Sequence, residues 1–304
     1  MQTMDARAVF SAADDETGNR PAFQVVAADP PPTPLVFASP HSGRHYPAVM
    51  LEAAAVDAEA LRRSEDAFVD QLIAPAATAG AAVITARYGR AWMDLNREPW
   101  ELDPAMFSDA LPDFAQGRTA RVAAGLGAIA RLAAEGREIY ARKLTFAEAK
   151  ARVESTHLPY HDALDRLLAR ARGAHGMAVL IDWHSMPEAA ARTAVTPRHG
   201  KGCDIVLGDR FGAACTRKLT DLVERELEAM GYRVARNAPY AGGYTTEHYG
   251  RPASRTHALQ IEISRALYLD EKTLEPTAGL AKLTADVGRL TAVLADSWPK
   301  LRPA

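Results

Sequence analysis

Short apolar runs recur along the chain and alternate with stretches that have helical spacing. The clearest runs are LVFAS (35–39), AAVITA (81–86), MAVLIDW (177–183) and HALQIEIS (257–264), and weaker ones lie at 90–95, 204–208 and 232–237. Short continuous apolar runs bounded by turn residues are typical of buried strands. We therefore expect a strand at each of these places.

The intervening stretches predict helices over 66–80, 160–176, 213–231 and 276–297. Gly80 and Gly231 are expected to end two of them, and Pro75 to kink the first. Residues 116–150 are rich in Ala, Arg and Glu and favour helix interrupted by glycines, so 104–160 is expected to be a helical insertion or cap. Strand and helix alternate elsewhere, which predicts a single α/β domain, residues 1–304, with a mainly parallel or mixed sheet.

Composition excludes few function classes but gives no sign of a charged macromolecular partner. The chain has 304 residues, 36 Lys plus Arg and 38 Asp plus Glu, for a formal net charge of -2. This balance does not indicate nucleic acid or an anionic membrane as partner. No apolar run is long enough for a membrane span, no signal peptide is apparent, and the two cysteines are too few for a disulfide framework. A reducing, cytoplasmic setting is the expectation.

Several familiar catalytic motifs are absent or out of context. GLGAIA (125–130) fits a dinucleotide-binding fingerprint but lacks the preceding strand that such a fingerprint needs. The sequence contains no phosphate-binding G-x-x-x-x-G-K-[ST], no G-x-S-x-G and no H-E-x-x-H. Nucleotide-binding and nucleophile-elbow serine chemistry are therefore disfavoured.

Reactive side chains instead follow the predicted strands. His41 follows 35–39, His184 follows 177–183, Asn96 and Arg97 follow 90–95, and Glu262 lies near the end of 257–264. Ligands of open α/β sheets bind beyond the carboxyl ends of the strands. We therefore expect these side chains to share one site.

The residue types suit a catalytic zinc ion. Such an ion takes three protein ligands, often two histidines and a carboxylate, and leaves one position for water. His41 and His184 supply the imidazoles, and the acid is expected from SEDAFVD (64–70), where Glu65, Asp66 and Asp70 all remain candidates. Glu262, on an apolar strand, suits a general base whose pKa is raised by burial. A metal-binding protein without catalytic activity is the alternative from another class.

Two further stretches bear on the pocket. HLPYH places His157 and His161 four residues apart, but Pro159 argues against a regular helix there, so His157 is expected to face solvent while His161 can face a cleft. The glycine-rich, aromatic stretch AGGYTTEHYGRP (241–252) is a candidate wall of the pocket.

Six motifs, SPHSG, DLNR, LPYHDAL, DWHS, GGYTTEHYG and HALQIEISRALYLDE, together resemble the N-formylglutamate amidohydrolase (N-formylglutamate deformylase) family. The resemblance runs from about residue 35 to 271 in the family's order. It implies a three-layer α/β/α sandwich similar to zinc carboxypeptidases and aspartoacylase. It also implies zinc-dependent hydrolysis of N-formyl-L-glutamate to formate and glutamate, a late step of histidine degradation.

The resemblance also implies roles for individual residues. It makes His41, Asp66 and His184 the metal ligands, Glu262 the general base and Arg97 the group that grips the substrate. Related carboxypeptidase-like enzymes take their acidic ligand three residues after the first histidine, where this chain has Arg44. Candidates for substrate contact are Arg97, Asn96, Arg44, Tyr244, Gly243 and His161. The closest alternative is a zinc hydrolase of another N-acyl amino acid or a short peptide.

Overall fold

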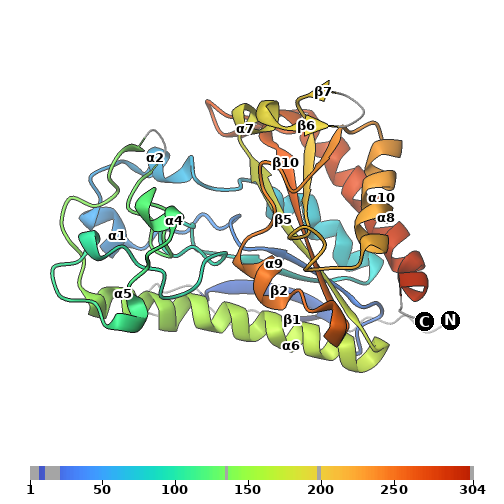
Figure 1. Ribbon diagram of the computed structural model, residues 1–304, viewed down its shortest axis with the longest axis horizontal. Helices are drawn as coiled ribbons and strands as arrows, with labels where there is room; N and C mark the ends of the chain where they lie inside the picture. The colour runs from blue at the N-terminus through green and yellow to red at the C-terminus, as the bar shows by residue number, and fades with distance from the viewer. Residues whose placement is uncertain (1–6, 11–20, 134–135, 197–199, 302–304) are drawn as a thin grey trace.

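A mixed sheet flanked by helices organises the protein, which is described here by a computed structural model covering residues 7–10, 21–133, 136–196 and 200–301 (Figure 1). Within these residues the main sheet has eight strands in the order β1-β2-β4-β3-β5-β10-β8-β9. The strands are β1 Arg7–Phe10, β2 Phe23–Ala28, β3 Leu35–Ser39, β4 Ala82–Ala86, β5 Ala178–Met186, β8 Ile205–Gly208, β9 Val234–Arg236 and β10 Thr256–Ser264.

The centre of the sheet is parallel. β4, β3, β5 and β10 run in the same direction, whereas β2 pairs antiparallel with β4, and β8 pairs antiparallel with β10. Two small ribbons, β6 Val195–Thr196 with β7 Gly200–Lys201 and β11 Leu269–Asp270 with β12 Glu275–Pro276, complete the described strands. The expected α/β fold with a mainly parallel or mixed sheet is confirmed.

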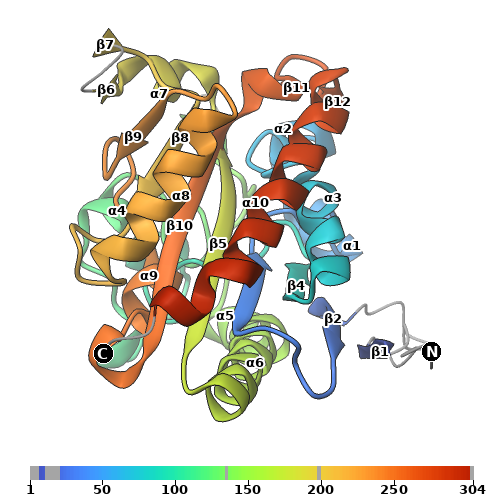
Figure 2. The ribbon, with the colours of Figure 1, turned by 90° about the vertical axis from the view of Figure 1, so that its right-hand side faces the viewer.

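Helices cover both faces of the sheet and make three layers. On one face lie α3 Val69–Ile73, η1 Ala74–Ala79, α8 Arg217–Ala229 and α10 Gly279–Leu301, as Figure 2 shows for the two long helices. On the other face lie α6 Leu158–His175 and α9 Tyr244–Tyr249. None of the described helices combines the length and apolar character that a bilayer crossing requires.

Side-chain alternation along the strands assigns each residue to one of these two faces. Val179, Ile181 and Trp183 of β5 belong to the core under α8 and α10, whereas Ala178 and Leu180 pack on the α6 side. The α6 side continues along the same strand with Asp182 and then His184, which are polar and buried. Because successive side chains of a strand point to opposite faces, one sheet face changes from apolar to polar toward its carboxyl edge.

The segment between β4 and α6 departs most from expectation. No strand forms at 90–95, and the described part of 104–142 is mostly irregular, with only η2 Pro104–Met106, η3 Asp113–Ala115 and α4 Ala120–Ala123; residues 134 and 135 lie outside the description. Gly125 and Gly136 have φ of 78° and 73°. A left-handed backbone at these positions breaks the helix that the Ala-rich composition favours.

Regular helix resumes only before α6. α5 Phe146–Arg152 begins with a capping box between Thr145 and Glu148 and runs through a π-helical turn, η5 Val153–His157, directly into α6. α1 Ala48–Ala53 and α2 Ala58–Arg62 lie with this segment in the left-hand part of Figure 1, beside the carboxyl edge of the sheet. η6 Pro252–Ser254 and η7 Arg265–Leu267 flank β10.

Candidate metal centre and active site

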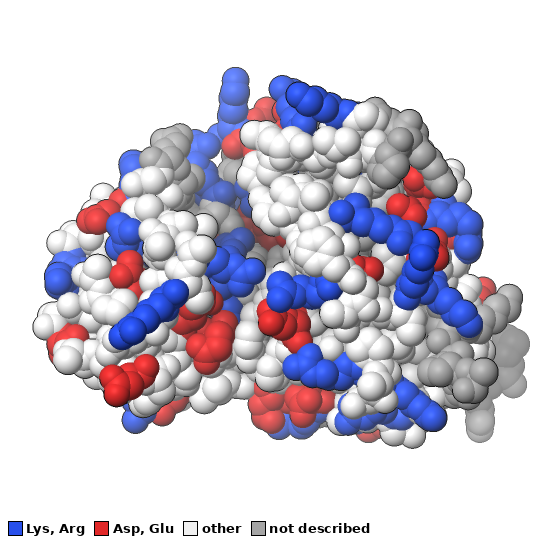
Figure 3. Space-filling view, in the orientation of Figure 1, with Lys and Arg blue, Asp and Glu red and all other residues white. Residues whose placement is uncertain are grey.

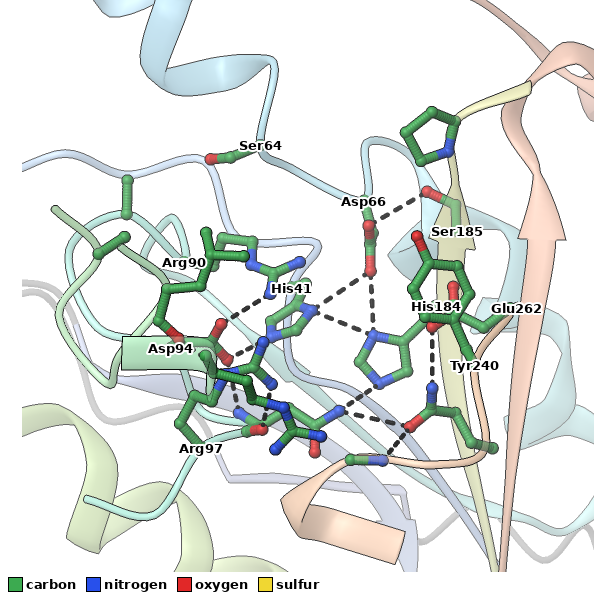
Figure 4. A pocket seen from close by; sticks show the side chains of 18 of the residues that line it. His41, Ser64, Asp66, Arg90, Asp94, Arg97, His184, Ser185, Tyr240 and Glu262 are labelled. Atoms are coloured by element: carbon green, nitrogen blue, oxygen red, sulfur yellow. Dashed lines mark hydrogen bonds and ion pairs between the residues drawn. The ribbon is translucent and has the colours of Figure 1, made fainter. Parts of the chain in front are cut away.

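His41, Asp66 and His184 meet beyond the carboxyl edge of the parallel strands (Figure 4). His41 lies two residues after β3 and His184 lies near the end of β5. The Nδ1 atoms of the two histidines are 3.1 Å apart. Asp66 Oδ2 lies 3.4 Å from His41 Nδ1 and 3.0 Å from His184 Nδ1. All three residues are at most 2% exposed.

Close backbone approaches position His41 and Asp66. The Asp66 amide donates to the His41 carbonyl at 2.9 Å, so the two segments are joined directly. After His41 the chain turns through Gly43, where a Cβ atom would lie 2.1 Å from the Tyr88 carbonyl oxygen. Only glycine fits that approach, and this explains the sharp turn after the histidine. Asp66 itself lies in the loop before α3 rather than in the helix expected from residue 66.

Carboxylates hold the outer nitrogen of each histidine. His41 Nε2 lies 2.6 Å from Asp94 Oδ1, and His184 Nε2 lies 3.0 Å from Asp182 Oδ2. Each Nε2–H therefore donates to a carboxylate, and each Nδ1 lone pair faces inward. Metal-binding histidines are typically oriented in this way. Asp94 and Asp182 were not among the residues predicted from the sequence, although Asp182 precedes His184 by two residues on a strand and so must share its face.

The inner arrangement suits a cation. Two imidazole lone pairs and one carboxylate oxygen converge within 3.4 Å of one another in a buried place. The two nitrogen lone pairs and the carboxylate oxygen repel one another at that separation unless a cation or a proton lies among them. Burial opposes a charge on His184, but Asp182 and Asp66 outweigh it and hold its pKa well above the usual value. The three residues can therefore hold a metal ion, and the donor set of two imidazoles and a carboxylate fits zinc.

Two further hydrogen bonds hold the Asp66 carboxylate in place. Its Oδ1 accepts hydrogen bonds from Ser185 Oγ at 3.2 Å and from the Arg265 guanidinium at 3.1 Å, which leaves Oδ2 for the histidines. The other two acidic candidates point elsewhere. Glu65 accepts from the Tyr46 hydroxyl at 2.8 Å, and Asp70 pairs with Arg44.

Glu262 stands beside the histidines on the neighbouring strand. It is in register with His184 across the parallel β5–β10 pair, and Gln260 is in register with Asp182. Gln260 Nε2 donates to Glu262 Oε1 at 2.8 Å. Burial raises the pKa of Glu262 to about 7, and the Asp66 charge adds to this effect, while His184 opposes it. A carboxyl group with such a pKa accepts and releases a proton near neutrality.

A cavity of about 610 Å³ opens onto this group and is rich in arginine. Figure 3 shows basic side chains around the hollow in the middle of the face that is turned to the viewer. The arginines that line the cavity are Arg63, Arg90, Arg97, Arg121, Arg210 and Arg265. Four of them pair with carboxylates: Arg63 with Glu59, Arg90 with Asp94, Arg210 with Glu247, and Arg265 with Asp66.

Among the described residues, Arg97 and Arg121 have no carboxylate partner, and both face this cavity. Burial lowers the pKa of the Arg97 guanidinium, and repulsion from Arg90 and Arg121 adds to this, although Asp94 opposes it. An anion bound between Arg97 and Arg121 would relieve that repulsion. Sequence reasoning missed Arg90 and Arg121, because no pattern signals that residues 90 and 121 face the same cavity.

The candidates for substrate contact divide into two groups. Arg97, Asn96 and Gly243 line the cavity. Asn96 Nδ2 lies 3.2 Å from His184 Nε2, and a Cβ on Gly243 would lie 2.4 Å from that amide nitrogen, so glycine is needed there. Arg44 lies outside the cavity in its ion pair with Asp70, and Tyr244 lines a neighbouring hollow instead. Arg97 and Asn96 also follow a turn, not the expected strand.

The histidines of HLPYH lie behind the cavity wall. His157 is 1% exposed, so the expectation that it faces solvent is wrong. Pro159 does not interrupt the helical run: it is the second residue of α6, just after the π-helical turn Val153–His157. His161 is also turned away from the cavity and bonds to the Leu95 carbonyl at 2.8 Å.

Known proteins resemble this chain over most of its length. The sequence profile of the N-formylglutamate amidohydrolase family matches residues 33–269. The N-formylglutamate deformylase of Pseudomonas putida is 31% identical over 78% of this chain and 82% of its own length, and that of Pseudomonas aeruginosa is 31% identical over 89% and 96%.

Solved structures agree with these sequence matches. The crystal structure of N-formylglutamate amidohydrolase from Ralstonia eutropha JMP134 superposes with a TM-score of 0.85 at 38% identity, over 92% of this chain and 99% of that one. A protein of Agrobacterium tumefaciens shares the fold, with a TM-score of 0.63 at 17% identity over 94% of this chain and 100% of its own. The chain belongs to the N-formylglutamate amidohydrolase family.

Proposed function

We propose that this protein hydrolyses N-formyl-L-glutamate to formate and L-glutamate, with a zinc ion held by His41, Asp66 and His184. The observation that carries the proposal is the convergence of their three donor atoms, beside a carboxyl group whose pKa lies near 7. A zinc ion bound there would lower the pKa of a water molecule and polarise the formyl oxygen. The family's members from Pseudomonas carry the same activity in their names.

The chain's own residues then move the proton and hold the substrate. Glu262 accepts a proton from the attacking water and delivers it to the nitrogen of glutamate as the C–N bond breaks. Asp94 and Asp182 keep the imidazoles in the tautomer whose Nδ1 is free. The cavity is lined by His184 and Ser185 of β5 and by Gln260 and Glu262 of β10, so the reacting amide lies against the carboxyl ends of these two strands.

The charge of the substrate matches the unpaired cations. N-formylglutamate carries two carboxylates, and Arg97 and Arg121 are the two cavity arginines without a carboxylate partner among the described residues. A planar guanidinium binds a carboxylate through two parallel hydrogen bonds. We therefore assign one carboxylate to each arginine, in place of the pairing with Arg44 or Tyr244 that the sequence suggested.

A second candidate is a larger N-acyl amino acid or a short peptide. The cavity of about 610 Å³ is roomy, and Leu126, Leu132 and Ile139 give it an apolar wall. A panel of formyl, acetyl and succinyl amides of Glu and Asp, with N-formylleucine as the uncharged-side-chain control, distinguishes the candidates. Preference for N-formylglutamate in kcat/KM supports the proposal, and preference for a bulkier acyl group supports the second candidate.

Glu262→Gln separates catalysis from metal binding. This isosteric change removes the proton acceptor and none of the three proposed ligands, so we expect stoichiometric zinc to remain while kcat falls by about 10²- to 10⁴-fold. Zinc analysis and formate release on the same sample measure both. Unchanged turnover would refute the role of Glu262, and a wild-type protein that binds zinc but cleaves no amide of the panel would indicate a metal-binding protein without catalysis.

A further inference from the structure

A second pair of histidines, His157 buried and His161 half-buried, lies behind the cavity wall. The rings of His157 and His161 stack with centroids 4.3 Å apart and planes 28° from parallel. Neither ring lines the cavity. The Nε2 atom of His157 lies 3.0 Å from the Arg97 carbonyl oxygen, and that of His161 lies 2.8 Å from the Leu95 carbonyl oxygen. Since a carbonyl only accepts, both imidazoles donate through Nε2–H.

The helical run around these histidines contacts the 92–97 segment at several residues between Arg152 and His161. The π-helical turn Val153–His157 lies between α5 and α6, and such turns frequently occur at functional sites. Within it Thr156 Oγ1 accepts a hydrogen bond from the Trp92 indole at 3.1 Å. The guanidinium carbon of Arg152, the last residue of α5, lies 4.0 Å from the centroid of the Trp92 ring. One helical run therefore holds Trp92, Leu95 and Arg97.

The held segment carries side chains of the site but belongs to no helix or strand. Asp94 bonds to His41, Asn96 contacts His184, and Arg97 enters the cavity. Backbone carbonyls buried outside regular structure need donors from elsewhere. The two imidazoles supply them at Leu95 and Arg97, the residues on either side of Asn96.

We propose that His157 and His161 are positioning residues for the hydrolysis. His161 fixes the Leu95 carbonyl and thereby the placement of Asp94 and Asn96 against the metal-binding histidines. His157 fixes the Arg97 carbonyl and thereby aims the guanidinium at a substrate carboxylate. The proposal rests on the proposed function for its kinetic consequences and on these distances for its structural ones.

The neutral state of the pair fits this role. Burial lowers the pKa of His157 to about 4. Burial, and then repulsion from His157, hold the pKa of His161 well below its usual value. Neutral imidazoles donate to the two carbonyls without placing further positive charge behind Arg97, which already has Arg90 and Arg121 nearby.

Paired substitutions test the role of each hydrogen bond. A glutamine amide nitrogen reaches the place of imidazole Nε2, whereas an asparagine amide reaches only the place of Nδ1. His157→Gln is therefore expected to keep kcat and KM within about twofold of wild type, and His157→Asn to raise KM about tenfold with kcat little changed. For His161→Asn we expect kcat to fall about tenfold, and His161→Gln to restore most of it.

His175 provides a matched control on the same helix. Its Nε2 lies 2.8 Å from the Pro31 carbonyl oxygen, the same kind of contact far from the cavity. His175→Asn is expected to lower Tm without changing KM or kcat. If the Asn and Gln variants of His157 and His161 show the same kinetics, or only lower Tm as His175→Asn does, the positioning role is refuted. If the Asn variants do not fold, a His157→Gln enzyme with a KM raised tenfold also refutes it.

The positioning role of the two histidines can be tested even if the proposed function is wrong. If wild-type protein releases no formate from N-formylglutamate, the comparison is repeated with whichever amide of the panel it hydrolyses, and crystal structures of wild type and His157→Asn are compared. Displacement of the 95–97 backbone in the variant supports the positioning role whatever the substrate. An unmoved Arg97 carbonyl overturns it.

Discussion

Two pairs of neighbouring histidines in one molecule differ in the groups that they contact. In the first pair, His41 and His184, the rings meet edge to face with centroids 4.7 Å apart, and each Nε2 faces a carboxylate. In the second pair, His157 and His161, the rings stack and each Nε2 faces a backbone carbonyl. His41, His184 and His157 are all buried and His161 is half-buried, so burial alone does not distinguish the two pairs.

The two histidine pairs differ in the groups to which their imidazoles are hydrogen-bonded. Carboxylates favour a charged imidazole or a bound cation, and the pKa of His184 is held above its usual value by Asp182 and Asp66 against the cost of burial. Carbonyls have no net charge to offset that cost, so the pKa of His157 falls. The first pair is therefore built to hold positive charge, and the second to stay neutral and donate a hydrogen bond.

The largest expected effect comes from removing a member of the first pair. His184→Ala deletes one of the three donor atoms, so we expect loss of stoichiometric zinc and a fall in kcat/KM of at least about 10³-fold. Metal analysis and formate release measure the two effects. His257→Ala, at a histidine equally buried on β10 but at the other end of the strand, is the control and should keep both. A His184→Ala protein that retains zinc would contradict the proposed ligand set.

The first pair was accessible to sequence reasoning, and the second was not. His41 and His184 end apolar runs of a parallel sheet, and strand ends of such sheets meet at one edge whatever the loops do. Asp182 and Gln260 share that face by simple alternation with His184 and Glu262, and this signal was available but unused. The role of His157 depends on a contact with Arg97, 60 positions away, through a loop with no periodic pattern.

The wall of the cavity escaped prediction for a related reason. Ala-rich composition over 116–150 favours helix, but the backbone there closes on itself around glycines. A Cβ on Gly127 would lie 2.5 Å from the Glu101 carbonyl oxygen, a contact that local propensity does not register. Arg121 lies on the short helix α4 within this segment and lines the cavity. Tertiary contacts outweigh intrinsic propensity in such segments.

A smaller effect is expected at the carboxylate behind the first pair. Asp182→Asn keeps the shape of the side chain but removes the charge that favours the correct tautomer of His184. Such changes behind a ligand typically cost about 10- to 100-fold in metal affinity or activity. Zinc affinity by competition with a chelator measures it. Asp286→Asn, at a 1% exposed aspartate of α10 bonded to Tyr232, is the matched control and should leave zinc affinity unchanged.

The smallest expected effect is a difference in pH dependence caused by the second pair. Burial lowers the pKa of His157 from an ordinary value of about 6.5 to about 4 in the folded protein. Between these values the unfolded chain binds more protons, so folding stability falls as pH drops below 6.5. The groups that face His157 are neutral His161 and Tyr244, with the charges of Asp94 and His248 nearby. The sign therefore follows from burial and not from an ion pair.

Replacing the His157 imidazole with an amide that does not titrate isolates the contribution of His157 to the pH dependence of stability. Going from pH 8 to pH 6, wild type should lose about 1 kcal/mol more free energy of unfolding than His157→Gln. Denaturant unfolding at both pH values, with both proteins stripped of metal, gives the double difference, in which the titration of the first pair cancels. A difference of opposite sign would mean that His157 is charged in the folded protein, and the contrast between the two histidine pairs would then be wrong.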